Sequence, residues 1–435
     1  MSDDPERTMT IPDRDGAARS APRPGLRVVF PRALAGWVDA PSRGETVLGR
    51  TSHARLDHRS VSREHLRLRV RGVGLAVADA GSHNGSFLDG APLGAEPTFA
   101  GPGALLRLGE VIAVVELLEQ DADEVDHEAI PGEAPRVRAL RRRVARLGPG
   151  AAPVLLLGQT GTGKERCARE LHRLSGRGPY VALNCAGLTR ELADSQLFGH
   201  RRGAFTGAAE AREGAFRRAH GGSLFLDEVA ELPLDVQAKL LRALESGEVT
   251  PLGSDTAQQT DVRVIAATHP DLSERVGDGL FRRDLYARLA LAEVELPPLS
   301  DRRGDIPEWL ARFDARWCET EGGDPLEWTS EAIETMALRA WPENLRGLDR
   351  EVYRLRCDLD EPLVLRAHVA REAEDDEDDS PEELSSRGGR LTRPSREELE
   401  RVLEENDGSI RATAKHYDRD RKQIYRWMEA YGLRK

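Results

Sequence analysis

The chain has 435 residues, 32% of them charged and 5% aromatic, and its formal net charge is −12. This length exceeds one ordinary core, so we expect about three domains. No run of about 18 apolar residues and no apolar secretory segment is present, so we expect neither a membrane span nor a signal peptide. The four cysteines form no CxxC pair and predict reduced thiols of a cytoplasmic protein. The acidic balance argues against nucleic-acid binding by the chain as a whole, so such a role needs a local basic patch.

The N-terminal part of the chain divides into a tail, a β-rich region and a linker. Residues 1–25 are rich in Pro, Asp, Arg and Ser and are expected to be disordered. Residues 26–118 contain short runs such as HLRLRV (65–70), in which apolar and charged residues alternate between glycine-rich turns. This pattern is typical of a small all-β sandwich. Residues 119–134 read as an acidic linker.

From residue 135 to about 370 the pattern changes to alternating strands and helices. VLLLG (154–158), SLFLDE (223–228) and VRVIAAT (262–268) are apolar runs that predict buried strands between helical stretches. Strands that alternate with helices indicate an α/β domain with a parallel sheet. A helical lid is expected over about 305–370.

The C-terminal part begins with a second acidic linker, expected over 371–393 as a solvated spacer. Residues 394–435 are helical in pattern and locally basic. Residues 409–435 carry eight Lys and Arg against three acidic residues, a local charge of +5. The last block is therefore the candidate for binding nucleic acid.

A nucleotide site is predicted at GQTGTGK (158–164), which follows an apolar strand and opens a helix. Its glycines let backbone N–H groups cradle phosphates, and Lys164 supplies a charge for the β- and γ-phosphates. Glu165 stands where the generic motif has Ser or Thr. The residues expected to bind ATP here are Gly158, Gln159, Thr160, Gly161, Thr162, Gly163, Lys164 and Glu165.

Two carboxylates end the strand about 60 residues further on. We expect Asp227 to hold Mg²⁺, directly or through water, and Glu228 to polarise the attacking water. Thr268 and His269 end the next strand, where a polar residue can touch the γ-phosphate. The alternative for these two residues is the ordinary polarity of a strand end.

Phosphoryl transfer also needs positive charge in the transition state. FRRDLYARL (281–289) offers Arg282 and Arg288, and WPENLRGL (341–348) offers Arg346. On local sequence alone, Arg282 and Arg288 are better explained as arginines on a helix surface. A surface arginine is also the alternative for Arg346.

The hexapeptide GAFTGA (203–208) places a phenylalanine among small residues with glycine on either side. With GQTGTGKE, NCAGL (184–188), GGSLFLDE, FRRDLYARL and WPENLRGL, it makes residues 135–370 resemble the AAA+ domain of sigma-54-dependent transcription activators. In that family the hexapeptide is the tip of a loop that contacts sigma-54. The resemblance assigns this contact to Gly203, Ala204, Phe205, Thr206, Gly207 and Ala208, with Phe205 exposed.

The resemblance implies a homo-hexameric ring that binds ATP between subunits and remodels the closed complex of sigma-54 RNA polymerase. It implies that Asn184 senses hydrolysis, that Arg282 and Arg288 act in trans, and that Arg346 is a second sensor. The chain departs from the family pattern at Gln196, Arg201, His269, Glu343 and Gly347.

Residues 26–118 resemble an FHA domain, through LGR (48–50), SREH (62–65), SHNGSFLDG (82–90) and the LRLGE strand. The resemblance implies phosphothreonine binding by Arg50, Ser62 and Asn84, because a guanidinium makes charge-assisted bonds to phosphate. The ligand is a phosphothreonine protein or the chain's own N-terminal tail. The alternative is a degenerate FHA fold used for packing.

Residues 394–435 resemble a Fis-type helix-turn-helix. REELERVLEEN, SIRATAKHY and RKQIYRWMEAYGL supply its three helices. The resemblance implies that the third helix binds double-stranded enhancer DNA through phosphates and base edges. Its candidate residues are Arg421, Lys422, Gln423, Tyr425 and Arg426. The alternative is a basic helical hairpin that contacts protein.

The sequence thus predicts a cytoplasmic, ATP-hydrolysing transcription activator with three domains. Two other hypotheses remain. One is a DNA-binding regulator that binds ATP without remodelling anything, and the other is a phosphopeptide scaffold with a vestigial ATPase.

Overall fold

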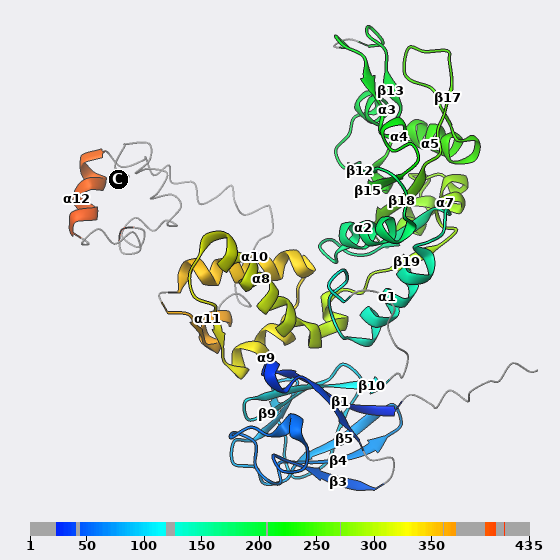
Figure 1. The fold of residues 1–435 in the computed structure, drawn as a ribbon. Helices are drawn as coiled ribbons and strands as arrows, with labels where there is room; N and C mark the ends of the chain where they lie inside the picture. The colour runs from blue at the N-terminus through cyan, green and yellow to red at the C-terminus, as the bar shows by residue number, and fades with distance from the viewer. Residues whose placement is uncertain are drawn as a thin grey trace, which may run out of the picture. The chain divides into compact units, whose positions relative to one another are not determined.

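The computed structural model describes residues 23–40, 44–118, 127–205, 208–269, 271–359, 361–370, 396–405 and 413. The chain forms two compact units, Met1–Arg371 and Glu372–Lys435. The first unit contains an N-terminal β-sandwich, an α/β subdomain and a helical subdomain (Figure 1). No helix among the described residues is long and apolar enough to cross a bilayer.

The sandwich consists of two antiparallel sheets. The larger has the order β2 (Gly36–Asp39), β1 (Arg23–Phe30), β10 (Val111–Leu118), β9 (Leu105–Leu108), β6 (Ser86–Leu88) and β7 (Ala91–Pro92). The smaller has the order β3 (Glu45–Leu48), β4 (Leu66–Arg71), β5 (Gly74–Asp79) and β8 (Thr98–Ala100). Two short 3₁₀ helices, η1 (Arg32–Leu34) and η2 (Ala54–Leu56), complete it.

The first strand begins earlier than the sequence predicts. Arg23, Pro24 and Gly25 pair with the end of β10. The expected disordered tail is therefore wrong at its last three residues, because a partner strand far along the chain supplies their hydrogen bonds. Alternation in β4 is as predicted, with Leu66 and Leu68 buried and Arg69 exposed.

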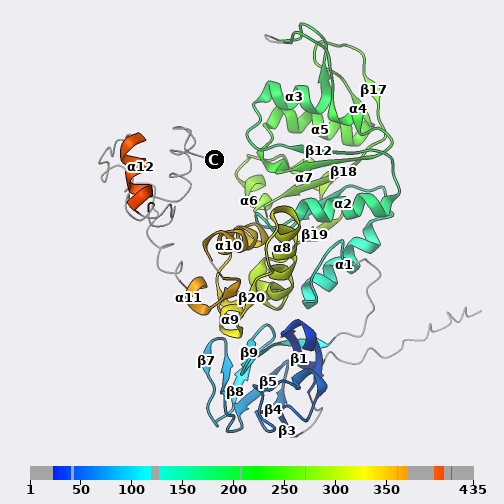
Figure 2. The ribbon, with the colours of Figure 1, turned by 60° about the vertical axis from the view of Figure 1, so that its left-hand side comes forward.

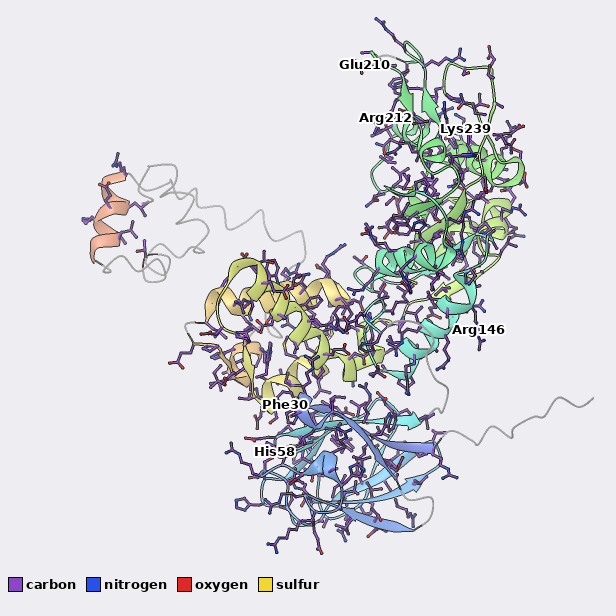
Figure 3. All side chains as sticks on the ribbon, in the orientation of Figure 1. Phe30, His58, Arg146, Glu210, Arg212 and Lys239 are labelled. Atoms are coloured by element: carbon purple, nitrogen blue, oxygen red, sulfur yellow. The ribbon has the colours of Figure 1, made fainter. Side chains whose placement is uncertain are left out.

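The hairpin β9–β10 is apolar on both faces because both faces are covered. Leu106, Leu108, Ala113 and Val115 lie in the core of the sandwich. The alternate residues Leu105, Ile112 and Val114 share a core with the helical subdomain. Phe30, at the end of β1, packs against this second core where the two parts meet (Figure 3).

The α/β subdomain is built on a parallel sheet. Its strand order is β12 (Tyr180–Asn184), β15 (Ser223–Asp227), β18 (Arg263–Thr268), β11 (Val154–Leu157) and β19 (Glu293–Glu295). One face is covered by α1 (Pro135–Leu147) and α2 (Lys164–Ser175). The other face is covered by α3 (Arg190–Phe198), α4 (Ala215–Arg218), α5 (Leu234–Ser246) and α7 (Arg283–Leu289) (Figure 2).

Smaller elements connect these layers. They are the hairpins β13 (Gly199–His200) with β14 (Arg212–Glu213) and β16 (Glu248–Val249) with β17 (Gln258–Gln259), and the helices η3 (Val229–Glu231) and α6 (Leu272–Gly277). Strand β15 explains the continuous apolar run in the sequence. Leu224 and Leu226 pack on one face of the sheet, and Phe225 packs on the other.

The helical subdomain begins with η4 (Leu299–Asp305), a 3₁₀ segment with a kink at Arg302. It continues with α8 (Ile306–Glu321), α9 (Ser330–Leu338), α10 (Asn344–Asp358) and α11 (Arg366–Val369), with the short pair β20 (Glu327–Trp328) and β21 (Leu363–Val364). Helices α8 to α11 lie within the range expected for the helical lid, about 305–370, and η4 begins six residues before it.

The expected acidic linker is shorter than its composition indicates. Ile130 and Ala134 are buried with Val137 in the core beneath the sheet. Residues 130–134 therefore belong to the α/β subdomain, which corrects the linker boundary at 134. In the second unit, helix α12 (Arg396–Glu405) buries Leu399 and Val402 at helical spacing, as the pattern of the predicted first helix requires.

Candidate functional site

The phosphate loop joins β11 to α2, in the strand–loop–helix order that the sequence predicts. Gly161 and Gly163 have φ values of 75° and 106°, a conformation that favours glycine. A Cβ at Gly158 would lie 2.8 Å from the hydroxyl of Thr162. The loop therefore needs its glycines for backbone conformation and for close packing, and it ends at the N-terminus of a twelve-residue helix.

Lys164 and the carboxylates are brought together at this loop. The Lys164 Nζ donates to the carbonyl of Gly158 at 2.8 Å and lies 3.4 Å from the Glu228 Oε1. Burial and the Glu228 carboxylate raise the pKa of Asp227, and Lys164 only partly opposes this rise. The paired carboxylates therefore form a site that a cation would stabilise.

Asn184 lies beside Asp227, because the ends of β12 and β15 are paired in register. Its side-chain oxygen accepts a hydrogen bond from the amide of Ala186 at 2.8 Å. A cavity of about 790 Å³ brings the phosphate loop, both carboxylates and Asn184 together with Arg346 on α10. Its lining is Thr160, Gly161, Gly163, Lys164, Glu165, Arg166, Arg169, Asn184, Asp227, Glu228, Trp309, Phe313, Leu345, Arg346 and Asp349.

Seven residues predicted for the nucleotide site do not line this cavity. Gly158, Gln159 and Thr162 belong to the phosphate loop itself, and the other four lie outside the loop sequence. Thr268 is fully buried, and its hydroxyl has no hydrogen-bond partner among the described residues. His269 lies 3.4 Å from Asp271 at an exposed position. Arg282 forms a two-bond pair with Asp284, and Arg288 donates to the carbonyl of Leu244. Thr268 nevertheless adjoins the phosphate loop through its backbone, because the amide of Gly158 donates to its carbonyl at 3.2 Å. The bonds given above for His269, Arg282 and Arg288 go to segments other than the phosphate loop.

The sequence reading missed two residues that hold the loop from the helical side. Buried Asn344 donates to the carbonyl of Thr160 at 3.0 Å and to Gln159 Oε1 at 3.2 Å. Arg302 donates to the carbonyl of Thr162 at 3.0 Å. Asn344 stands within the WPENLRGL segment already singled out for Arg346, but no local pattern marks the role of Arg302.

The GAFTGA segment lies between strands β13 and β14 in the chain. Its residues 206–207 fall outside the described part. The amide of Gly203 donates to the carbonyl of Ala208 at 2.8 Å, which closes the turn. Phe205 is half-buried, with its ring edge-on to His200 at 5.0 Å. The expectation of a fully exposed Phe205 is therefore wrong, because the neighbouring imidazole covers one side of the ring. Figure 3 shows Glu210 and Arg212 at this end of the subdomain.

The predicted phosphothreonine residues gather at one corner of the sandwich. The amide of Arg50 donates to the carbonyl of Ser62 at 2.9 Å, and the Ser62 hydroxyl accepts from the amide of His83 at 3.0 Å. Asn84 donates through its side chain to the carbonyl of Ser60 at 2.8 Å. These bonds place the Arg50, Ser62 and Asn84 segments side by side, as a shared anion site requires.

His65 joins the Ser62 and Gly85 segments at the same corner. Its Nδ1 accepts from the amide of Ser62 at 2.9 Å, so its Nε2 carries the proton that it donates to the carbonyl of Gly85 at 3.1 Å. Burial lowers the pKa of His65, in accord with a neutral ring. The predicted DNA-binding residues 421–426 lie outside the described residues.

The fold and the cavity define an AAA+ ATPase domain with a helical lid, preceded by an FHA sandwich. Residues 130–295 match the family described as Sigma-54 interaction domain, and residues 46–109 match the FHA domain family. The chain belongs to the family of sigma-54-dependent transcription activators.

Individual relatives agree with this assignment. The DNA-binding transcriptional regulator NtrC of Rhizobium meliloti (strain 1021) is 40% identical over 287 residues, which cover 65% of this chain and 58% of that protein. The sigma54-dependent transcriptional activator SfnR of Pseudomonas putida is 44% identical over 223 residues, covering 51% and 61%. The chain therefore spans about three fifths of the length of these relatives.

A solved structure gives the same result for the fold. NtrX from Brucella abortus in complex with ADP is 30% identical with a TM-score of 0.53, over 72% of this chain and 70% of that one. The same protein in complex with ATP is 29% identical with a TM-score of 0.51, over 72% of this chain and 70% of that one.

Proposed function

We propose that this chain hydrolyses ATP to remodel the closed complex of sigma-54 RNA polymerase. The observation that carries the proposal is the convergence of Lys164, Asp227, Glu228 and Asn184 on one cavity beneath the lid. These are the groups that phosphoryl transfer requires: a phosphate-binding cation, a metal-binding carboxylate and a carboxylate that orients water.

The contacts of Lys164 support a change in the site when ATP binds. The Lys164 ammonium pairs with Glu228 and bonds the carbonyl of Gly158. The phosphates of ATP compete for this ammonium, which releases Glu228 to accept a proton from the attacking water. Loop amides and the N-terminus of α2 hold the phosphates in line with that water.

The carboxylate pair fits a magnesium ion, since Mg²⁺ takes one or two carboxylates and substrate phosphates. The pKa of Asp227 is raised because burial and the Glu228 carboxylate disfavour its negative charge, and Lys164 offsets this only in part. A bound cation would offset the remainder. Asp227 is the residue that would hold the ion, and the ion would neutralise charge on the phosphates.

Asn184 is the proposed link between hydrolysis and the sigma-54 contact. It ends β12, and the chain then runs through α3 directly into the hairpin that carries GAFTGA. A change at the carboxylates can thus be passed along one short stretch of backbone to Gly203–Ala208. Phe205 and Thr206 are the proposed points of contact with sigma-54.

The proposed active form is a homo-hexamer with ATP between subunits. Arg282 and Arg288 lie outside the cavity of their own chain, as trans-acting arginines must, and Arg346 lines it, as a sensor in cis must. Thr268 and His269 remain proposals for the γ-phosphate sensor. The Arg282–Asp284 pair is exposed and contributes little to stability, so a neighbouring nucleotide can displace it.

Two further partners are proposed. The corner formed by Arg50, Ser62 and Asn84 binds phosphothreonine, in another protein or in the chain's own tail. The C-terminal residues Arg421, Lys422, Gln423, Tyr425 and Arg426 bind double-stranded enhancer DNA. A protein with these partners acts in the cytoplasm.

The test combines purified chain, ATP, Mg²⁺ and sigma-54 holoenzyme on a cognate promoter. Permanganate footprinting would report an open complex that requires hydrolysable ATP. Steady turnover without promoter opening would favour a phosphopeptide-regulated ATPase of another purpose. Nucleotide binding without turnover would favour the DNA-binding regulator that remodels nothing.

A further inference from the structure

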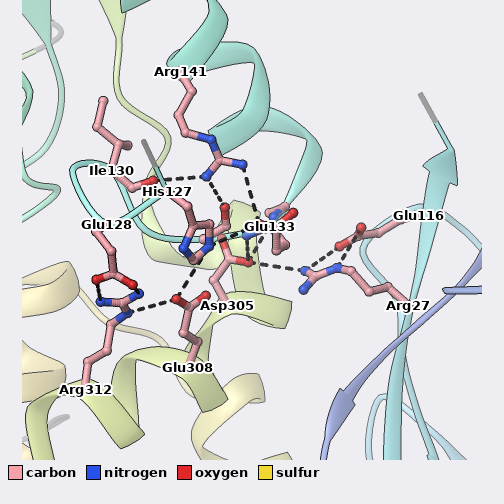
Figure 4. A network of polar contacts seen from close by, with 12 residues as sticks. Arg27, Glu116, His127, Glu128, Ile130, Glu133, Arg141, Asp305, Glu308 and Arg312 are labelled. Atoms are coloured by element: carbon pink, nitrogen blue, oxygen red, sulfur yellow. Dashed lines mark hydrogen bonds and ion pairs between the residues drawn. The ribbon is translucent and has the colours of Figure 1, made fainter. Parts of the chain in front are cut away.

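The sandwich and the ATPase domain share a buried ionic contact centred on Arg27 (Figure 4). Arg27 lies on β1 and donates two bonds to Glu116 on β10, at 3.0 and 2.8 Å. Its Nη2 also donates to Asp305 Oδ1, the last residue of η4, at 3.2 Å. Burial alone would lower the pKa of Arg27, but the two carboxylates raise it, so the guanidinium stays charged in the interface.

Asp305 joins three segments through one oxygen. Besides Arg27, Oδ1 accepts the amides of Glu133 at 2.8 Å and Ala134 at 2.9 Å, just before α1. The side chain is fully buried, and its Oδ2 has no hydrogen-bond partner among the described residues. A buried carboxylate in this position depends on its ion pair, because removal of one partner leaves an uncompensated charge.

Gly304, which has no side chain, leaves the space that the Arg27 guanidinium occupies. A Cβ on Gly304 would lie 2.6 Å from Arg27 Nη2 and 3.0 Å from Val114 Cγ2. Gly304 is outside the positive-φ region, so a side chain there would displace the Arg27 guanidinium without straining the backbone. The contact surface between the sandwich and the helical subdomain is called the seam below. On this seam, Ile112 and Val114 are buried with Trp309 of the lid.

A second ion pair lies elsewhere on the seam. Arg107 on β9 donates to Glu334 on α9 at 2.8 Å. This pair joins the sandwich to the lid without a bond to η4. It therefore provides a matched control for the Arg27 contact.

The segment η4 also reaches the phosphate loop. Arg302, three residues before Asp305, is buried and donates to the carbonyl of Thr162 at 3.0 Å. The amide of Leu299, at the start of η4, donates to Asn344, and Asn344 in turn donates to the carbonyl of Thr160. One seven-residue segment thus contacts the sandwich and, through two routes, the nucleotide loop.

We propose that Arg27 is a positioning residue for the phosphate loop, through Asp305, η4 and Arg302. The docked FHA domain holds η4 in the place from which Arg302 supports the loop, so adenine nucleotide affinity depends on Arg27. By linkage, bound nucleotide stabilises the docked domain to the same extent. The inference rests on the nucleotide binding of the proposed function, but it needs neither phosphothreonine nor sigma-54.

The test measures ADP affinity by calorimetry on full-length variants. Arg27→Met removes the charge that Asp305 faces, and we expect affinity to fall about fivefold or more. Arg27→Lys keeps the charge and restores most of that affinity. Arg107→Met breaks the contact between β9 and α9. This variant should remain within about twofold of wild type, because the bonds of Arg107 involve neither η4 nor Arg27.

A second readout separates positioning from loss of folding. In hydrogen exchange, ADP should slow the amides of Glu133 and Ala134 in the wild type and not in Arg27→Met. If Arg27→Met does not fold, Asp305→Asn keeps the shape and removes the charge attraction, and the same loss of affinity is expected.

Two results would overturn the inference. One is a folded Arg27→Met chain, or a folded Asp305→Asn chain in its place, that binds ADP like wild type. The other is an equal loss of affinity in Arg107→Met, which would assign the effect to the seam as a whole. Failure of the wild-type chain to bind ADP would instead refute the proposed function, and the inference with it.

Discussion

The side-chain amide of Asn344 donates to the carbonyl of Thr160 at 3.0 Å, so the first residue of a lid helix is bonded to the phosphate loop. Asn344 has φ near 50°, a conformation that Asn adopts more readily than other side chains. The lid therefore contacts the phosphate loop directly, through a side chain whose backbone conformation suits Asn.

Asn344→Ala should weaken both the fold and nucleotide binding. The substitution leaves the buried amide of Leu299 and two loop acceptors without their partner, at a cost of about 1–3 kcal/mol for an unsatisfied buried group. Thermal unfolding and ADP calorimetry would measure the two effects. Asn344→Asp keeps an acceptor for Leu299 but turns a carboxylate oxygen toward the two loop acceptors, so it should weaken ADP binding at least as much as Asn344→Ala. Unchanged ADP affinity in both variants would refute a role for this bond in binding.

Glu228→Gln should abolish turnover while ADP and ATP still bind. The amide cannot take a proton from water, and loss of a general base costs about 100-fold or more. Steady-state phosphate release measures turnover, and calorimetry measures binding. Glu231→Gln, an exposed acid outside the cavity, is the matched control. Turnover in Glu228→Gln close to that of the control would remove Glu228 from the mechanism.

Phe205→Ala should retain ATP turnover and lose promoter opening. The ring is half-buried against His200 and lies outside the cavity, so its loss leaves the nucleotide site intact. Phosphate release and permanganate footprinting on the same preparation would separate the two activities. Phe99→Ala, an exposed phenylalanine on the sandwich, serves as control. Wild-type promoter opening by Phe205→Ala would end the assignment of the tip to sigma-54.

Arg50→Ala should lower affinity for a phosphothreonine peptide about tenfold or more, since a charge-assisted bond contributes about 1.5–3 kcal/mol. Arg50→Lys should recover only part of this affinity, because a lysine lacks the fork of the guanidinium. Fluorescence anisotropy with phosphorylated and unphosphorylated peptides is the measurement, and Arg69→Ala on the exposed face of β4 is the control. Equal affinity for both peptides in the wild type would favour a degenerate FHA fold.

The sandwich should lose stability as the pH falls below about 6.5. His65 has a pKa lowered by burial from 6.5, so the unfolded chain takes up this proton at a higher pH than the folded chain. One such proton gives a slope of at most about 1.4 kcal/mol per pH unit. Denaturant unfolding at several pH values would measure it. His65→Gln should flatten this component of the profile. An unchanged slope in His65→Gln would assign it to other groups.

Short-range patterns in the sequence determined much of this protein. Alternation predicted β4, the apolar runs predicted the parallel strands, and GQTGTGK predicted a strand–loop–helix. These features are readable because each depends on residues within a few positions of one another. The family relation was readable for the same reason, since its motifs are short segments.

Only the tertiary structure decided which distant groups meet. Arg27 and Asp305 are 278 residues apart, and no local sequence pattern around either residue predicts their ion pair. The continuous apolar run of β9–β10 predicted burial, but only the fold shows that its two faces serve two different cores. The half-burial of Phe205 likewise depends on the ring of His200 beside it. The physical reason is that burial and ion pairing depend on which surfaces are in contact. Those contacts form between segments that are far apart in the sequence, so local patterns do not reveal them.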